Sequence, residues 1–397
     1  MTVKQRVASG AMPRPSAACT ALLATIVVFL SSSAGTTAVA SASAIPAARG
    51  AAVEASPDLD EPISALQPQQ PRLAYLTETA TSTPKVWLAS ASGGEAKLLG
   101  PGQEPLLAPD GQLVAVSLFG ITPGPDEHGP AIGLYAASGA PVVDYLKLEA
   151  GIATPLAWSP DSTYLAVYVQ STQTVGAVAA SSLDVIDTQT GTVTTIAKGA
   201  LYGVSFAHDG SDRLVFGLSH SQSFAGGANL YTSEPDGAGL RRLTGDGRSL
   251  NPVWGPRYIA YDRERSRHLS PEYQIWLATP SGGPPVRRVT HIPVNSLAQG
   301  LVPLAFSADG NRLLAEFEGQ DQSDAYAVNV LTGRARAVTV HGRAVLGAGI
   351  SAGGGTLLIE ENALFGPPSG ARIATIPFAG GRSHVIVAHG SQGSWND

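Results

Sequence analysis

The 397-residue chain has few cysteines, few charges and few aromatic residues. Cys19 is its only cysteine and lies in an N-terminal apolar run, so the rest of the chain offers no disulfide, thiolate nucleophile or cysteine-ligated metal site. Charged residues make up 14% of the chain, well below the roughly 25% of an average protein, which argues against a coiled coil or a long solvated helix. The net charge of −6 gives no basic footprint, so we expect no nucleic-acid partner.

Apolar and turn-forming residues are abundant. Hydrophobic residues make up 44% of the chain, which is enough to bury a large core. Glycine (45) and proline (29) together account for 74 of the 397 residues. That excess stays below the roughly 25–30% combined share of a disordered low-complexity chain. The composition therefore indicates a globular protein with many tight turns.

The N-terminus has the pattern of an export signal. Basic residues (Lys4, Arg6 and Arg14) precede an apolar run over residues 17–30, and small residues at 38–40 fit an A-x-A cleavage site. The run has 14 residues, fewer than the roughly 20 that a transmembrane helix needs. We interpret residues 1–40 as a secretory signal peptide, with a membrane anchor as the alternative. We expect no membrane span after cleavage, and a secreted, periplasmic or cell-envelope location.

Residues 41–70 are rich in alanine and proline with scattered acids, which predicts a flexible leader. The domain that carries the fold is then expected over residues 71–397.

A short motif recurs along this domain. It consists of an apolar or aromatic residue, a small residue and an Asp/Gly turn, as in Trp158-Ser159-Pro160-Asp161. The lead residues are Leu107, Trp158, Phe206, Trp254, Phe306 and Ile350, at spacings of 51, 48, 48, 52 and 44 residues. Each turn is followed by an apolar run, a polar loop, a third run and a Gly-rich turn before a fourth run. Four short strands in a unit of about 40–50 residues are typical of a β-propeller blade.

The first unit lacks its first strand, and the chain ends on an orphan first strand around Trp395. We therefore expect an all-β propeller of seven four-stranded blades, in which the C-terminal strand closes the N-terminal blade. Such closure removes open sheet edges. Six blades are the alternative, because the unit that begins at Ile350 is degenerate.

The Trp-Ser-Pro-Asp turn at 158–161, with its relatives at 206–210 and 306–310, resembles the WD40-like repeat of TolB-type propellers. The same repeats occur in the propeller domains of prolyl-oligopeptidase-type peptidases. The resemblance covers roughly residues 71–397 and implies a propeller fold. TolB-like function would be the binding of a protein or cell-envelope partner without catalysis.

Strand order predicts where binding would occur. The first-to-second and third-to-fourth turns are short and share one face, whereas the second-to-third connections are long and lie on the opposite face. We call the face that carries these long connections the long-loop face. We expect the functional surface there and at the mouth of the central channel, since long loops on a rigid scaffold carry binding sites. Two charged loops on the fifth and sixth units supply the candidate binding residues, which are Arg263, Arg265, Arg267, His268, Glu318, Asp321 and Asp324.

These two loops predict a polar contact patch or a weak oxygen-ligand cation site. The alternative is a pair of solvated loops with surface ion pairs of little energetic weight. Asp126, Glu127 and His128 form another loop cluster that could hold a cation, with the same alternative. A divalent cation is the one cofactor that these residues would take, and otherwise we expect none.

Several residues that invite a catalytic interpretation have a structural explanation. Asp110, Asp161, Asp209 and Asp309 recur at the same turn position, where an aspartate caps its own turn. Residues 349–353 match the G-x-S-x-G nucleophile elbow, but a strand follows where the elbow needs a helix. The pairs Arg241-Arg242 and Arg287-Arg288 are expected on outer strands facing water.

Two functions remain open at this point. The favoured one is a secreted, monomeric, non-catalytic binding module. The other is a propeller enzyme, of the lactonase or lyase type, with a site built at the channel mouth from several blades. The absence of a recognisable catalytic motif favours the first, but sites scattered over blades leave no local motif.

Overall fold

The structure is a computed structural model that describes residues 71–77, 83–118, 131–139, 143–147, 151–171, 181–219, 227–264, 272–293, 299–319, 323–363 and 370–396. Chain contacts separate residues Met1–Gln69 from residues Gln70–Asp397, and the fold below is that of the second unit. Its regular elements are β-strands, as expected. In the ranges given above, no helix is long and apolar enough to cross a membrane. The predicted signal peptide and leader lie outside those ranges.

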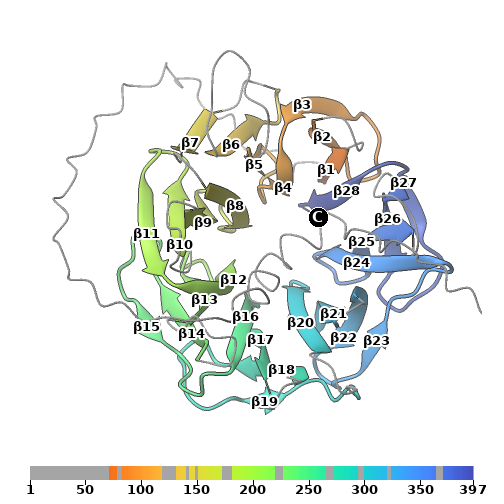
Figure 1. Ribbon diagram of the computed structural model, residues 1–397. Helices are drawn as coiled ribbons and strands as arrows, with labels where there is room; N and C mark the ends of the chain where they lie inside the picture. The colour runs from red at the N-terminus through yellow and green to blue at the C-terminus, as the bar shows by residue number, and fades with distance from the viewer. Residues whose placement is uncertain are drawn as a thin grey trace, which may run out of the picture. The chain divides into compact units, whose positions relative to one another are not determined.

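The strands form antiparallel sets of four, which we number as blades 1 to 7 along the chain. The first strand of each set lies nearest the centre of Figure 1 and the fourth lies at the rim. The inner strands are β28 (Ser391–Trp395), β4 (Gln103–Leu107), β8 (Gly151–Trp158), β12 (Ala200–Phe206), β16 (Ser249–Trp254), β20 (Gln299–Phe306) and β24 (Arg343–Ile350). The second strands are β1 (Arg72–Thr77), β5 (Leu113–Ser117), β9 (Tyr164–Ser171), β13 (Leu214–Ser219), β17 (Ile259–Glu264), β21 (Arg312–Glu318) and β25 (Thr356–Ala363).

The outer half of each blade consists of a third and a fourth strand. The third strands are β2 (Lys85–Ser90), β6 (Ala131–Ala136), β10 (Ser181–Asp187), β14 (Asn229–Ser233), β18 (Glu272–Ala278), β22 (Ser323–Asn329) and β26 (Arg372–Pro377). The fourth strands are β3 (Lys97–Pro101), β7 (Val143–Lys147), β11 (Val193–Lys198), β15 (Arg241–Arg242), β19 (Arg287–Arg288), β23 (Ala335–Ala337) and β27 (His384–Val387).

Strand pairing joins these sets into five separate four-stranded sheets and one eight-stranded sheet. The larger sheet contains blades 5 and 6, which are linked by a short parallel pairing of β18 with β20. The sets coincide with the four-strand units expected from the sequence. A propeller of seven blades requires these sets of four strands. The number of blades stays a prediction.

The inner strands form a closed cycle of neighbours. Each of them contacts the inner strand of the next blade, and β24 is followed by β28, which contacts β4. The C-terminal strand β28 pairs antiparallel with β1, with Trp395 opposite Leu73. The predicted closure of the N-terminal blade by the C-terminal strand is confirmed, and it leaves the inner edge of β1 paired.

Every inner strand carries an irregularity in its pairing with the second strand. The shifts occur near the middle of the strand, as between Pro303 and Ala305 of β20 or between Gly347 and Gly349 of β24. The same shift is present in the other inner strands. A β-bulge bends a strand and raises its twist. The repeated bulge is therefore expected to bend each inner strand near its middle.

Apolar clusters join neighbouring blades, as expected for strands covered on both faces. Leu313 of blade 6 packs with Ala260 and Ile275 of blade 5. Trp254 and Phe206, two lead residues of the repeat, are almost fully buried. Their interpretation as blade-packing residues is confirmed, and hydrophobic burial between blades stabilises the ring.

The repeat aspartates cap their turns. The Oδ1 atom of each accepts a hydrogen bond from the backbone N–H two residues later, at 2.9–3.1 Å, in Asp110, Asp161, Asp209 and Asp309. Ser351, the serine of the G-x-S-x-G match, lies in the equivalent turn between β24 and β25, and its Oγ accepts the N–H of Thr356. Both features therefore belong to the architecture of the blade.

Substituting the cap of blade 3 gives a first test. We expect Asp161→Ala to lower the free energy of unfolding by about 1 kcal/mol, because the N–H of Thr163 loses its acceptor. Asp161→Asn keeps a side-chain oxygen at that position and serves as the matched control. Urea unfolding followed by circular dichroism measures the difference, and equal midpoints for the two variants would contradict the assigned role.

Candidate functional site

The predicted site residues are placed on strands rather than in loops wherever the structure describes them. Arg263 lies on β17, which stays paired with β18 up to Glu264. Glu318 ends β21 and Asp324 lies on β22, in a ladder that continues to the pair Glu318↔Ser323. The expectation that these three residues lie in loops is therefore wrong. Backbone pairing continues past the apolar run because half-buried polar side chains do not interrupt a ladder.

The other predicted residues lie outside the described ranges. They are Arg265, Arg267, His268 and Asp321, together with the cluster Asp126, Glu127 and His128. Of the seven binding candidates, the structure therefore places three. All three lie at or next to the strand ends that lead into the long-loop face, and their part in binding stays a prediction.

The structure assigns Arg263 and Glu318 to different clusters. Successive residues of a strand point to opposite sides of the sheet, so Asp262 and Arg263 face in different directions. Asp262 is influenced by the charge of Glu318, whereas Arg263 forms an ion pair with Asp246, with 2.6 Å between Nε and Oδ2. We describe the two as the arginine pocket and the acidic cluster.

The arginine pocket is a cavity of about 150 Å³ on blade 5. Its lining residues are Arg248, Arg263, Glu264, Gln274, Trp276 and Arg288. They come from the connection into β16 and from β17, β18 and β19. The Arg263 guanidinium lies over the Trp276 ring, 4.9 Å from its centroid, a distance suited to a cation–π contact.

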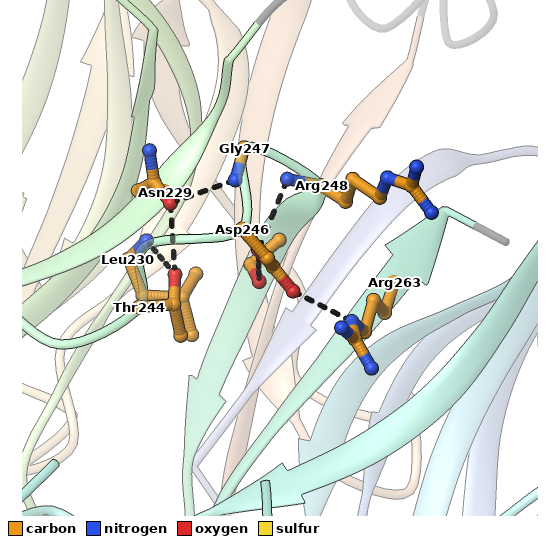
Figure 2. A network of polar contacts seen from close by, with 8 residues as sticks. Asn229, Leu230, Thr244, Asp246, Gly247, Arg248 and Arg263 are labelled. Carbon is orange, nitrogen blue, oxygen red and sulfur yellow. Dashed lines mark hydrogen bonds and ion pairs between the residues drawn. The ribbon is translucent and has the colours of Figure 1, made fainter. Parts of the chain in front are cut away.

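Asp246 connects two residues that line the pocket, Arg248 and Arg263 (Figure 2). Its Oδ1 accepts hydrogen bonds from the Arg248 N–H at 3.1 Å and from the Ser249 hydroxyl at 2.9 Å, and its Oδ2 binds Arg263. A carboxylate that binds both a loop backbone and a guanidinium fixes them relative to each other. Asp246 is therefore a positioning residue for the pocket.

The loop that carries Asp246 is fastened to blade 4. The Asn229 side-chain oxygen accepts the Gly247 N–H at 3.0 Å, and the Thr244 hydroxyl accepts the Leu230 N–H at 2.9 Å. Gly247 has a φ of 64°, and a Cβ atom there would lie 3.1 Å from the Cα atom of Gly227. Both the backbone conformation and the close approach favour glycine at this position.

A related set of hydrogen bonds on blade 5 joins β18 to Thr290. The Thr290 hydroxyl accepts the Ile275 N–H at 2.9 Å and donates to the Gln274 side-chain oxygen at 3.0 Å. The sequence carries a signal for this arrangement in the similar stretches Arg-Arg-Leu-Thr at 241–244 and Arg-Arg-Val-Thr at 287–290. We predicted both arginine pairs as water-facing. Arg241 and Arg242 are exposed, but Arg287 and Arg288 are half-buried, and Arg288 lines the pocket.

The acidic cluster lies at the same end of blades 5 and 6. Asp262 is 1% exposed and its Oδ1 atom has no hydrogen-bond partner. Burial, reinforced by the charge of Glu318, raises the pKa of Asp262 to about 8. Burial raises the pKa of Glu318 to about 7, and burial with the Glu318 charge raises the pKa of Glu316 to about 8. Among the described residues, no group of three or more His, Cys, Asp or Glu is arranged to hold a metal ion.

Solved structures with a similar fold are known. No protein-family model matches the chain, and no curated protein matches its sequence. TolB from Acinetobacter baumannii aligns over 82% of this chain and 66% of its own, with a TM-score of 0.50 and 14% sequence identity. The β-propeller domain of the Trilobed protease from Pyrococcus furiosus aligns over 80% of this chain and 92% of its own, with a TM-score of 0.57 and 12% identity.

The fold is a TolB-like β-propeller. An oligogalacturonate lyase in complex with manganese shares it, with a TM-score of 0.53, 14% identity and coverage of 73% of this chain and 82% of its own. At these identities the likeness concerns the fold alone, and the chain spans about two thirds of the length of TolB. The Trilobed protease propeller has an open velcro topology, whereas here β28 pairs with β1.

Proposed function

We propose that this TolB-like propeller is an exported, non-catalytic binding module that recognises a protein or cell-envelope partner through its long-loop face. One observation carries the proposal. The arginine pocket lies at the end of blade 5 that leads into the long loops, where Asp246 orients the Arg263 side chain. Arginine and tryptophan are enriched where interfaces concentrate their binding energy.

The opposite face supports this assignment because its repeat aspartates and Arg336 serve the fold. The repeat aspartates there cap their own turns. Arg336 donates to the backbone oxygen of Phe378 on the next blade, so its side chain fastens two blades to each other. The arginine pocket lies at the other end of the strands, on the long-loop face, and offers oriented guanidinium groups of the kind that protein interfaces use.

Charge reversal on the two faces tests the proposal. The variant Arg248→Glu/Arg288→Glu changes the long-loop face, and Arg334→Glu/Arg382→Glu makes the same charge change at exposed turns of the opposite face. In affinity capture from an envelope extract of the source organism, we expect the first variant to recover roughly tenfold less of any partner that the unmodified protein enriches. The second variant should recover it fully. Loss of the partner in the second variant alone would overturn the proposal.

A second candidate function is catalysis at the acidic cluster. Glu316 and Glu318 have pKa values of about 8 and 7, and carboxyl groups poised near neutral pH serve as general acids and bases. A solved structure with the same fold is an oligogalacturonate lyase with manganese. Turnover of oligogalacturonate with manganese, lost in Glu318→Gln while the protein stays folded, would favour this candidate over the binding module.

A further inference from the structure

The acidic cluster contains a buried acceptor without a donor. Asp262 of β17 is 1% exposed, and its Oδ1 atom has no hydrogen-bond partner in the part of the chain that the structure describes. The buried Glu361 also has such an oxygen, but its other oxygen pairs with Arg372. The charge that acts on Asp262 is that of another acid, Glu318. An unpaired buried acceptor is costly, so Asp262 suits a donor that comes from outside the chain.

Half-buried side chains from three blades lie near Asp262. Glu318 of blade 6 and Tyr273 of blade 5 are within electrostatic reach of it, and Tyr202 of blade 4 is within reach of Tyr273. All three of these side chains remain partly exposed. The acidic cluster therefore has a buried floor, which is Asp262, and a rim that solvent reaches.

The backbone holds the rim together at the junction of blades 5 and 6. Strands β18 and β20 pair in parallel at Tyr273↔Gly300, and β20 pairs with β21 at Gly300↔Glu318. A Cβ atom on Gly300 would collide with the backbone of Tyr273, so glycine permits this close approach. Tyr273 and Glu318 therefore occupy fixed backbone positions on either side of one strand.

The charge and the donors of a fitting ligand follow from these groups. Two carboxyl groups attract a cation, and the unpartnered Asp262 oxygen needs an N–H or O–H donor. A primary ammonium group supplies both, since it carries three N–H donors on one positive charge. A quaternary ammonium group has the charge and no donor. The hydroxyl groups of Tyr202 and Tyr273 add further acceptors at the rim.

We propose that the acidic cluster binds a primary ammonium group, carried either by a lysine side chain or by a free amine. Asp262 accepts one N–H at the floor, and Glu318 and Tyr273 accept the others at the rim. Rotation of the half-buried Glu318 side chain, at the end of its strand, admits the group to Asp262. The proposal goes beyond the binding function assigned to the arginine pocket, because it concerns a second site of opposite charge.

Binding is expected to tighten as the pH rises. Burial and the Glu318 charge raise the pKa of Asp262 to about 8, and burial raises the pKa of Glu318 to about 7. Both acids therefore hold protons at pH 6, whereas the ammonium group binds their ionised forms. Its Kd should fall at least roughly tenfold between pH 6 and 8.5. The polar groups that face Asp262 and Tyr273 are Asn251 of β16, Tyr202 of β12, Glu264 of β17 and Glu318 of β21.

Ligand-observed NMR at pH 8.5 tests the proposal on the purified protein. The probe is n-butylammonium, n-butanol is the neutral control of the same length, and tetramethylammonium is the cation without a donor. We expect only n-butylammonium to bind. Asp262→Asn keeps the shape of the side chain and removes its charge, and it should weaken binding at least roughly tenfold. Asp236→Asn makes the same change at an exposed turn of blade 4 and should leave binding within about twofold.

Glu318→Gln keeps the test decisive if Asp262→Asn does not fold, and it should weaken binding several-fold. A second probe, Nα-acetyl-lysine amide, separates the two sources. Its binding assigns the site to a lysine side chain, and binding of n-butylammonium alone assigns it to a free amine.

Equal binding of n-butanol or tetramethylammonium, or equal effects of Asp262→Asn and Asp236→Asn, would overturn the proposal. So would binding that weakens between pH 6 and 8.5, or a calcium ion that binds through Asp262 when n-butylammonium does not. The assay needs no partner. A negative result therefore removes the ammonium site and leaves the proposed function to its own test.

Discussion

A chain that ends at Gly390 is expected to lose its cooperative thermal unfolding transition or to melt more than about 10 °C below the full chain. The deletion removes β28, the inner strand of blade 1, and leaves the edge of β1 unpaired. Exposed strand edges pair with other chains. The half-buried Trp395, which packs against an apolar cluster, is lost as well, at part of the roughly 3–5 kcal/mol that removal of a fully buried aromatic side chain costs. Circular dichroism melts with size-exclusion chromatography measure both effects.

The expected loss is large because β28 connects three blades. Ser394 of β28 accepts the Leu107 N–H of blade 2 at 3.0 Å, and Asn396, directly after the strand, accepts the Arg72 N–H of blade 1 at 2.7 Å. The Gln392 N–H donates to Glu360 of blade 7 at 2.7 Å. Removal of Asp397 alone is the control. A truncated protein that stays monomeric and melts within a few degrees of the control would show that the ring does not depend on this strand.

The protein is expected to be most stable in mildly acidic solution and to lose stability as the pH rises from about 5 to 9. The pKa values of Asp262, Glu316 and Glu318 are about 8, 8 and 7 in the folded protein, against about 4 in an unfolded chain. Between these values the folded state holds protons that the unfolded state has released. The contribution of these three groups to stability is therefore fully present below about pH 4. It is lost as the pH rises through their pKa values in the folded protein.

The effect is expected to amount to several kcal/mol, and to a fall of roughly 5–10 °C in the thermal midpoint between pH 5 and 9. The turn aspartates act in the opposite direction and at lower pH, since hydrogen bonds to Ser307 and Asn311 lower the pKa of Asp309 to about 2. Asp262→Asn/Glu316→Gln should flatten the decline, whereas Asp236→Asn, at an exposed turn, should leave it unchanged. A midpoint that rises between pH 5 and 9 would contradict the assignment of raised pKa values to these three carboxyl groups.

The blade architecture could be predicted because the repeat encodes it locally. The turn at Asp161 and its relatives fixes where first and second strands meet, and the apolar runs after each turn mark the second strands. Strand ends were less predictable. Arg263 and Glu318 are charged, which suggests a loop, yet both remain in a β-ladder because pairing depends on the backbone.

The candidate site could be predicted only in part, because it is assembled from separate segments. Arg263 was a candidate from its sequence, but its partner Asp246 lies 17 residues earlier and belongs to the connection between two blades. Trp276 and Arg288 resembled ordinary blade residues. Asp262 is influenced by the charge of Glu318 because side chains alternate between the two sides of β17 and because Asp262 is buried. An interpretation that places these residues in loops considers neither effect.

Site-specific photo-crosslinking in the source organism tests the central claim most directly. A photoreactive residue at His291 lies in the exposed connection after β19, on the long-loop face and three residues after the pocket residue Arg288. One at Thr190 lies at an exposed turn of the opposite face. The account predicts a discrete crosslinked partner from position 291, reduced by Arg288→Gln, and none from position 190. Crosslinking of the same partner from position 190, with none from position 291, would contradict the assignment of the long-loop face as the binding surface.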